Sequence, residues 1–451
     1  MNLHAAGFFL IGRRFAIALI AAALPLLNPA RADATTIERV VSPGGIEAWL
    51  VREPAVPLIA LQFAFLGGSN QDPEDKAGVA TMAASLWKEG AGEFNAKKFQ
   101  QALDDKAIEL DFSVGRDHVQ GSLLTLKENR DAAFNYVRLA LTAPRFDATA
   151  VERVRAQKIS DVRRQSTNPR SIAVRRWWAA AFPRHPYGRP MSGTLDSIPR
   201  ISIDDLKSYT QRVLSRDTLK VAVVGDIDAE TLRRLLDDTF GALPASAELQ
   251  HVADVKPERI GRQLFDQLNV PQSVLLFGGA GVARNDPDFM AAFVVNHILA
   301  NGSSSRLYQE LREKHGLVYA VSESLLWLEH ASVLLGDTAT RTEAASETIG
   351  MIKHEMQRMA ESGPAEQELA EAKSLLKNSF VLGLDTSSKV AHLLVEMQLA
   401  NLGMDYMERR PGLIEAVTIE DARRVAKRLF GSGLLVTMVG RSLGVASTET
   451  Q

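Results

Sequence analysis

The chain contains no cysteine among its 451 residues. This absence excludes disulfide bonds, thiolate ligands for zinc, a cysteine nucleophile and a lipid-anchored cysteine. Histidine is scarce as well, with nine in the whole chain, so any metal site would have to combine a few imidazoles with carboxylates. Neither charge sign dominates, because 52 Lys and Arg face 54 Asp and Glu. This balance gives no reason to expect nucleic acid as a partner.

Long hydrophobic runs are also missing downstream of Ala32. No later apolar run reaches about 18 residues, the length that predicts a membrane-spanning helix. The composition, 46% hydrophobic and 24% charged, is typical of a soluble protein. At roughly 150 residues per domain, the length predicts two or three domains. We therefore expect no membrane insertion once the N-terminal segment has been removed.

The segment 1–32 has the three parts of a signal peptide. Arg13 and Arg14 form a positive region, residues 15–27 form an apolar stretch, and Ala30-Arg31-Ala32 is a small-residue cleavage motif. The alternative is a buried helix, but the position near the initiator methionine and the cleavage motif favour a signal peptide. We expect cleavage after Ala32 and a periplasmic or otherwise exported chain. The sequence leaves the choice between the Sec and twin-arginine routes open.

The sequence after residue 32 contains an internal repeat. VPLIALQFAFLGGSNQDP, from Val56, corresponds to VPQSVLLFGGAGVARNDP, from Val270. Near the end of each unit, SIDDLKSYTQRVL from Ser202 corresponds to TIEDARRVAKRLF from Thr418, and almost the same interval separates both pairs of segments. Generic strand and helix patterns would not share a spacing. We therefore predict a tandem duplication of a domain and not a solenoid.

Each unit mixes strand and helix periodicity. In the first unit, strands are predicted at 46–51, 58–65, 108–114, 119–126 and 219–224, and helices at 77–87, 96–103, 148–162 and 203–214. The strands come in groups without regular β-α-β alternation. This order predicts an α+β fold, in which each domain has a mainly antiparallel sheet covered on one side by helices.

A polar, unperiodic stretch at 244–257 predicts a linker between the units. The expected organisation is therefore a signal peptide at 1–32, an N-terminal domain at 33–243, the linker at 244–257 and a C-terminal domain at 258–451.

Four segments carry a family resemblance: residues 65–90, 182–228, 301–324 and 418–430. They resemble the corresponding stretches of the pitrilysin/insulinase zinc peptidases, in the bacterial and mitochondrial-processing branch of that family. The resemblance extends over residues 36–441. It implies two homologous α+β domains arranged as a clamshell, with a peptide substrate held between them.

The zinc motif of that family is not kept. In H-x-x-E-H, two histidines on one helix face bind the metal and the glutamate activates water. The resemblance places Thr81, Ala84 and Ser85 at these three positions, and Asp161 at the position of the third ligand. One carboxylate does not hold a zinc ion, which normally needs three protein ligands. We expect no metal or cofactor in this chain and no peptidase activity from this chain alone.

A second element of the family's active site is kept. The run LREKHGLVY, which contains Arg312 and Tyr319, resembles the Arg/Tyr pair that the family's C-terminal domain contributes to catalysis. Arg312 is expected on a helix that ends at Gly316, and Tyr319 on the next strand, on the face shared by Leu317 and Val321. Spacing alone favours an ordinary helix arginine and strand tyrosine. The resemblance favours donors that bind the substrate carbonyl and its oxyanion.

Two smaller clusters have simple structural interpretations. Gly302-Ser303-Ser304-Ser305 lacks the pattern of a phosphate-binding loop and predicts serine capping of the helix from Arg306, or contact with a substrate backbone. Trp177 and Trp178 follow two arginines, and we expect a helix that buries them.

The sequence therefore supports three functional hypotheses. The first is the non-zinc subunit of an exported heterodimeric metalloendopeptidase, in which a homologous partner with H-x-x-E-H holds zinc and Arg312 and Tyr319 complete its site. The second is a catalytically inactive scaffold or peptide-binding protein, as the family's respiratory-complex core subunits imply. The third is an independent serine or carboxylate hydrolase, which the absence of a G-x-S-x-G elbow disfavours.

Overall fold

The computed structural model describes residues 36–441, apart from the side chain of Val381. The predicted signal peptide and its cleavage motif lie outside the described residues. In residues 36–441, none of the helices combines the length and the apolar character needed to cross a membrane.

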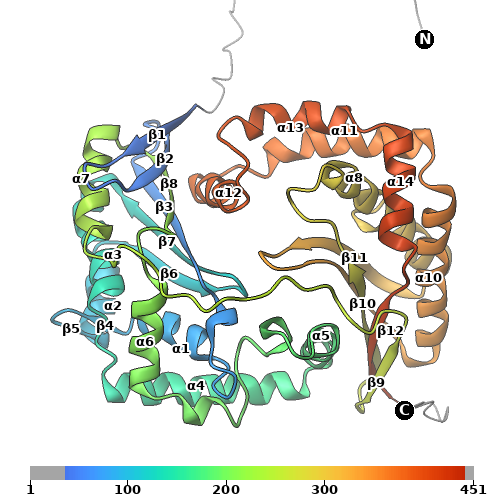
Figure 1. The fold of residues 1–451 in the computed structure, drawn as a ribbon, viewed down its shortest axis with the longest axis horizontal. Coiled ribbons are helices and arrows are strands. Elements are labelled where there is room, and N and C mark those ends of the chain that lie inside the picture. The colour runs from blue at the N-terminus through green and yellow to red at the C-terminus, as the bar shows by residue number, and fades with distance from the viewer. Residues whose placement is uncertain (1–35, 442–451) are drawn as a thin grey trace, which may run out of the picture. The chain divides into compact units, whose positions relative to one another are not determined.

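The first half builds a six-stranded sheet in the order β1-β2-β8-β3-β7-β6 (Figure 1). Its strands are β1 (Ile37–Val41), β2 (Glu47–Arg52), β3 (Leu58–Leu66), β6 (Glu109–Val114), β7 (His118–Leu126) and β8 (Lys220–Gly225), and a separate short hairpin joins β4 (Gly90–Ala91) to β5 (Phe94–Asn95). Strands β2 and β8 are parallel, and the other described pairings of this sheet are antiparallel. The helices of this half are α1 (Val79–Leu86), α2 (Ala96–Asp104), α3 (Arg130–Thr142), α4 (Ala148–Thr167), α5 (Pro169–Ala181), α6 (Ile203–Val213) and α7 (Ala229–Phe240).

The second half builds a five-stranded sheet in the order β11-β12-β10-β13-β9. Its strands are β9 (Gln263–Gln267), β10 (Gln272–Ala280), β11 (Val318–Trp327), β12 (Ser332–Arg341) and β13 (Leu435–Gly440). Its helices are α8 (Phe289–Ala300), α9 (Arg306–Tyr308), α10 (Ala345–Ser362), α11 (Glu366–Leu382), α12 (Ser387–Leu399), α13 (Tyr406–Glu415) and α14 (Ile419–Phe430). Here the parallel pair is β13 and β9, and the remaining described pairings are antiparallel. The α+β class with two mainly antiparallel sheets is therefore confirmed.

The two halves repeat the same elements at the predicted spacing. The interval along the chain from β3 to β10 is almost the same as that from β8 to β13. Helices α6 and α14 both begin with a capping box. In α6, Ser202 Oγ accepts from Asp205 N (3.2 Å) and the Asp205 carboxylate accepts from Ser202 N (2.7 Å). Thr418 and Asp421 make the same reciprocal bonds in α14, which satisfies two backbone donors that each helix start leaves free.

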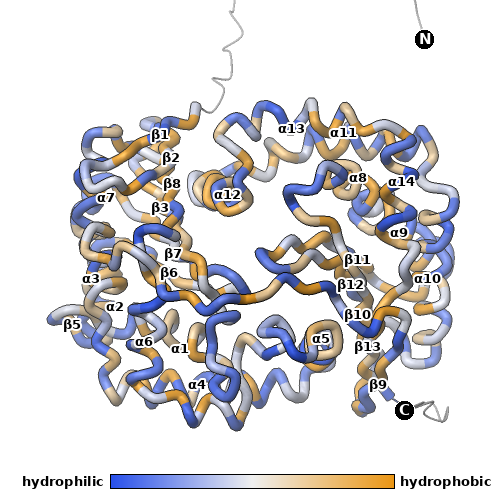
Figure 2. The backbone as a smooth tube through the Cα atoms, in the orientation of Figure 1, coloured by the Kyte–Doolittle hydropathy of each residue, from blue (hydrophilic) through white to orange (hydrophobic). Residues whose placement is uncertain are grey.

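Each half lends one helix to the other half's sheet. Helix α5 packs on the second sheet, where Trp177 Nε1 donates to the carbonyl oxygen of Leu435 (3.1 Å) and Thr437 Oγ1 donates to that of Ala173 (3.0 Å). Helix α12 packs on the first sheet, where Gln398 Nε2 donates to the carbonyl oxygen of Val221 (2.8 Å). Figure 2 shows hydrophobic positions on both helices and on the strands that they cover.

This exchange corrects the expectation that helices cover each sheet on one side only. Seven of the nine residues of β3 are buried, in the continuous pattern LIALQFAFL. A strand exposed on one face alternates between buried and exposed residues, whereas a strand covered on both faces does not. One face of the first sheet packs against the helices of its own half, in a core that includes Phe63 and Trp87. The other face packs against α12, in a core that includes Ala60 and Leu394.

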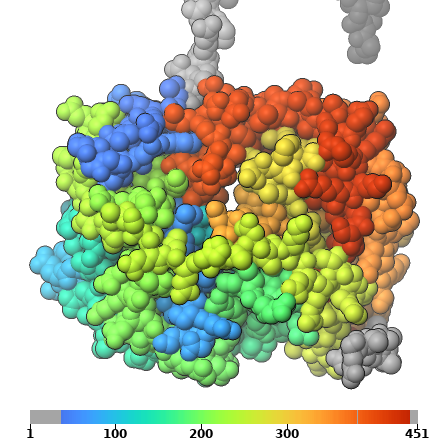
Figure 3. Space-filling view, viewed as in Figure 1, coloured from blue at the N-terminus to red at the C-terminus, as the bar shows by residue number. Residues whose placement is uncertain are grey.

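The chain between α7 and β9 has no helix or strand, and it is bonded to both halves. Gln250 N donates to Gln71 Oε1 (2.7 Å) in the first half, and Val255 N donates to the carbonyl oxygen of His330 (2.8 Å) in the second. Glu258 N donates to the carbonyl oxygen of Ala181 (2.7 Å) at the end of α5. In Figure 3 this segment runs across the face turned to the viewer. It connects the halves and is hydrogen-bonded to both of them.

Candidate functional site

Arg312 lies in a π-helical turn, Gln309–Lys314, directly after the short helix α9. Such turns are rare, and they are frequent at functional sites. Leu317 N donates to the carbonyl oxygen of Leu311 (2.8 Å), and Gly316 N donates to that of Arg312 (3.0 Å). Gly316 has a φ of 58°, the left-handed conformation that glycine adopts readily at the end of a helix. The predicted helix end at Gly316 is confirmed, and the turn brings the start of β11 back beside Arg312.

The structure places Arg312 and Tyr319 together. The guanidinium carbon of Arg312 is 4.9 Å from the ring centroid of Tyr319 and 4.9 Å from that of Tyr308. Its Nη1 donates to the Tyr308 hydroxyl, and its Nε lies 3.6 Å from Glu313 Oε1. The arginine is therefore held between two aromatic rings, in the arrangement of a cation–π contact.

Tyr319 is 82% exposed, and the expectation that it shares a face with Leu317 and Val321 is wrong. Both of those residues are buried. The pairing of β11 with β12 shifts between Val318 and Val321, and such a bulge inserts an extra residue that turns the following side chains. Tyr319 consequently points to solvent at the edge of the second sheet, since β11 is an edge strand.

Tyr308 is the member of this cluster that the sequence analysis missed. It is the last residue of α9 and precedes Arg312 by four residues. Side chains at this spacing are neighbours on a helix, so the signal was present. Together the cluster presents a guanidinium fork and an exposed phenol, groups that donate hydrogen bonds to a carbonyl oxygen or a developing oxyanion.

The four zinc-motif positions lie on α1 and α4, which pack against each other. Thr81 Oγ1 donates to the carbonyl oxygen of Met191 (2.8 Å), and Ser85 Oγ donates to that of Thr81 (2.8 Å). Ala84 is buried and brings no donor atom, and Asp161 is paired with Arg164 one turn along α4. These residues do not fit a zinc ion. Within residues 36–441, no group of three or more His, Asp and Glu residues is arranged to hold a metal.

The motif positions and the Arg312–Tyr319 pair belong to different halves. No hydrogen bond or ion pair among the described residues links the two sets. Helices α1 and α4 are thus present, but without side chains that could bind zinc. In the second half, by contrast, the side chains of Arg312 and Tyr319 are clustered.

Two buried acids have strongly raised pKa values. Burial raises the pKa of Asp72 to about 7, against the opposing effect of the Gly78 and Ala80 amides, which donate to its carboxylate at 2.7 and 2.8 Å. These bonds place the start of α1 at Val79, two residues later than predicted.

On β11, burial raises the pKa of Glu323 to about 8, and both of its carboxylate oxygens lack a hydrogen-bond partner among the described residues.

The remaining two clusters are the run at 302–305 and the tryptophan pair. Ser305 occupies the N-cap position of α9 but makes no side-chain capping bond, because its hydroxyl donates to the carbonyl oxygen of Gly302 (2.8 Å). The prediction of serine capping is therefore wrong. Trp177 and Trp178 are buried as predicted, and the guanidinium of Arg116 lies 3.7 Å above the Trp178 ring.

Residues 200–376 match the model of the peptidase M16 inactive domain. This part of the chain is similar to the inactive domain of M16 peptidases. This confirms the resemblance to the pitrilysin/insulinase zinc peptidases, and the matched domain is the inactive one.

Curated proteins that are similar to this chain carry two kinds of description. A "Non-peptidase homolog YmxG" from Helicobacter pylori is 26% identical over 338 residues, which cover 74% of this chain and 77% of that protein. An "uncharacterized zinc protease" from Streptomyces coelicolor is 24% identical and covers 90% of both chains.

Solved structures share the M16 fold. A peptidase M16 inactive domain from Pseudomonas fluorescens has a TM-score of 0.85 at 22% identity, covering 91% of this chain and 99% of that one. A protease from Helicobacter pylori has a TM-score of 0.82 at 20% identity, covering 90% of this chain and 100% of that one. Both structures show that this chain shares their fold.

Proposed function

We propose that this chain is the non-zinc subunit of an exported heterodimeric metalloendopeptidase. A homologous partner with an intact H-x-x-E-H motif would hold the zinc ion and its water, while Arg312 and Tyr319 would reach the same substrate from this chain. One observation carries the proposal: the side chains of Arg312 and Tyr319 are assembled, with Tyr319 exposed and Arg312 half-buried, whereas the zinc positions hold Thr81, Ala84 and Ser85. An M16 chain that keeps one part of the site and lacks the other is suited to work with a chain that has the missing part.

The two side chains would act on the substrate carbonyl. The planar guanidinium of Arg312 and the hydroxyl of Tyr319 are donors that strengthen their hydrogen bonds as negative charge develops on the oxygen. Stacking between Tyr308 and Tyr319 holds the guanidinium in place before substrate arrives, and such preorganisation avoids a reorganisation cost during the reaction. Removal of one donor of this kind typically raises the barrier by about 2.7–4 kcal/mol.

The test is reconstitution with a homologous chain from the same organism that carries H-x-x-E-H. Each chain alone should leave an unstructured peptide uncleaved, and the mixture should cleave it. Arg312→Ala should lower kcat/KM of the complex by about 10²- to 10³-fold without changing complex formation in size-exclusion chromatography. Arg233→Ala, at an exposed position of α7, is the matched control and should retain full activity. Cleavage by this chain alone, or full activity of Arg312→Ala, would contradict the proposal.

The second candidate is a scaffold or peptide-binding protein without a catalytic role. The description of the Helicobacter relative as a non-peptidase homolog favours it. In that case no zinc-bearing chain copurifies, and changes at Arg312 and Tyr319 leave function intact. Affinity purification from the native organism, followed by mass spectrometry and zinc analysis of the complex, separates the two candidates.

A further inference from the structure

A pocket of about 150 Å³ lies between α8, α11, α12 and α13. Its walls are mainly aromatic and apolar, and two arginines, Arg284 and Arg410, line it. The pocket borders the first half as well, since Gln120 of β7 donates to Glu396 of α12 (2.7 Å) in its wall. None of its residues belongs to the Arg312 cluster or to the zinc-motif positions.

The two guanidiniums are stacked on the aromatic walls. The guanidinium carbon of Arg284 is 4.1 Å from the ring centroid of Phe289 and 5.1 Å from that of Tyr406. That of Arg410 is 4.2 Å from the ring centroid of Phe380. These contacts fix both planar groups beside the same cavity, and Tyr406 neighbours both of them.

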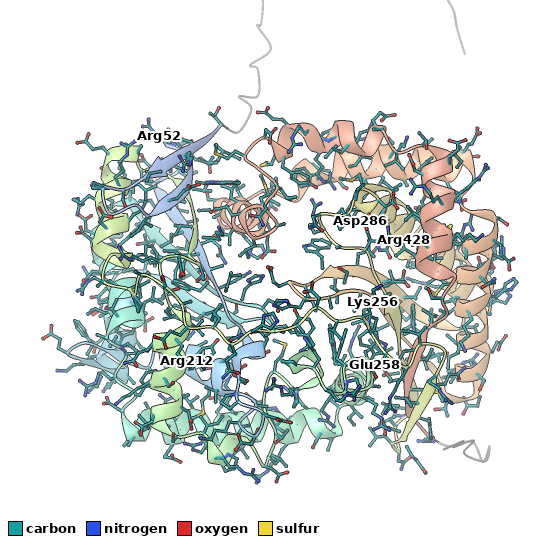
Figure 4. All side chains as sticks on the ribbon, viewed as in Figure 1. Arg52, Arg212, Lys256, Glu258, Asp286 and Arg428 are labelled. Carbon is teal, nitrogen blue, oxygen red and sulfur yellow. The ribbon has the colours of Figure 1, made fainter. Side chains whose placement is uncertain are left out.

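Neither arginine has a carboxylate partner among residues 36–441. The acids nearest to Arg284 in the sequence are committed elsewhere: Asp286 pairs with Arg428 (2.7 Å), and Asp288 pairs with both Arg424 and Arg428. Figure 4 shows Asp286 and Arg428 beside each other. Glu396 contributes one negative charge to the pocket wall, so the pocket keeps an excess of positive charge.

These arginines are also partly removed from water. Burial lowers the pKa of both Arg284 and Arg410, and Tyr406 acts in the opposite direction. A desolvated cation without a counter-charge is costly, and aromatic stacking offsets only part of that cost. An anion bound between the two groups would remove the imbalance and form charge-assisted hydrogen bonds with them.

We propose that this pocket binds the free C-terminal carboxylate of a peptide together with its last, bulky apolar side chain. The carboxylate matches the donor fork of a guanidinium, and the aromatic walls bury the side chain. An apolar cavity of about 150 Å³ is large enough for one benzene ring, so the pocket takes a single large side chain. This binding goes beyond the proposed catalytic role and needs no zinc-bearing partner.

The proposal is tested with the mature chain and three probes: a hexapeptide that ends in Phe with a free carboxylate, the same peptide with a C-terminal amide, and a free-acid peptide that ends in Gly. Trp327 lines the pocket, with its ring centroid 5.2 Å from that of Phe289, so binding should change its contribution to the fluorescence of the five tryptophans. Calorimetry gives the affinities. We expect the Phe free acid to bind at least tenfold more tightly than the amide and the Gly peptide. Equal affinities, or no binding of the Phe free acid at millimolar concentration, would overturn the proposal.

Variants assign the binding to this pocket. Arg284→Gln should weaken the Phe free acid at least tenfold and bring it level with the amide, and Arg284→Lys should restore part of the difference. Arg233→Gln is the matched surface control. Arg410 donates to the carbonyl oxygen of Leu376 (3.0 Å) and supports the fold, so it is not the first variant. A fatty acid such as decanoate is the competing anion: tight decanoate binding without peptide binding would overturn the assignment to a peptide C-terminus.

Discussion

The guanidinium carbon of Arg312 lies 4.9 Å from the ring centroid of Tyr319, although a change from helix to strand separates them in the chain. The π-helical turn and the bulge at the start of β11 create this proximity. The first turns the chain at Gly316, and the second points the phenol to solvent.

Tyr319→Phe should therefore impair catalysis without impairing folding. In the proposed heterodimer, loss of the hydroxyl should lower kcat by about 10²- to 10³-fold with little change in KM, because the bond strengthens in the transition state. Since the side chain is 82% exposed, the free energy of unfolding should change by less than about 0.5 kcal/mol. Steady-state kinetics and urea denaturation check the two halves of this prediction, and an unchanged kcat would remove Tyr319 from the site.

Trp177→Ala and Leu394→Ala should both destabilise the protein. Both side chains are completely buried in helices lent to the opposite sheet. Loss of Trp177 should cost about 3–5 kcal/mol and loss of Leu394 about 2–5 kcal/mol, from lost burial and the cavities left behind. Urea unfolding measures both, and Arg175→Ala, at an exposed position of the same helix as Trp177, is a control that should stay within about 0.5 kcal/mol of the parent.

Glu323 should make the protein less stable as the pH rises. Its pKa is about 8 in the folded chain against an ordinary value of 4.5, so the folded state holds a proton that the unfolded state has released. The stabilisation is fully present below about pH 4.5 and is lost as the pH rises through about 8. Denaturation at pH 5 and pH 9 should show that Glu323→Gln removes a few kcal/mol of this difference. Parallel pH profiles of the two proteins would show that the carboxyl does not titrate in this way.

The N-terminal segment should direct export. Expression of the full chain in a Gram-negative host should yield a periplasmic protein whose first residue is Asp33, as determined by N-terminal sequencing. Ala32→Tyr should block processing, because the cleavage site requires a small residue, and the longer precursor should accumulate. A cytoplasmic protein that retains its first residues would refute the signal-peptide prediction.

The sequence predicted the parts of the fold that depend on local periodicity. The strand at 58–65, the helix from Ile203 and the regular interval between the repeated elements are all present, because each is visible in the order of apolar residues and caps. It also predicted that Arg312 and Tyr319 form a pair, and the structure brings their side chains together.

Other features depend on contacts that no local pattern reports. The lending of α5 and α12 joins segments that are far apart in the chain, as in the bond from Gln398 to Val221. The orientation of Tyr319 depends on a bulge in its pairing with β12, and the alternation of apolar residues predicted the opposite face. The positive charge of the pocket around Arg284 depends on the nearby acids, which are paired with Arg424 and Arg428. These pairs form because of how α14 packs.

The packing of α5 and α12 on the opposite sheets has a consequence for the folding and the rigidity of this chain. If the first half were expressed alone, α5 would lose the surface that buries Trp177, and its own sheet would expose the strands that α12 covers. We expect neither half to fold by itself, and the whole chain to unfold in a single transition although its two halves repeat the same elements. The same packing limits motion. The two sheets cannot separate as rigid bodies unless α5 leaves the second sheet and α12 leaves the first.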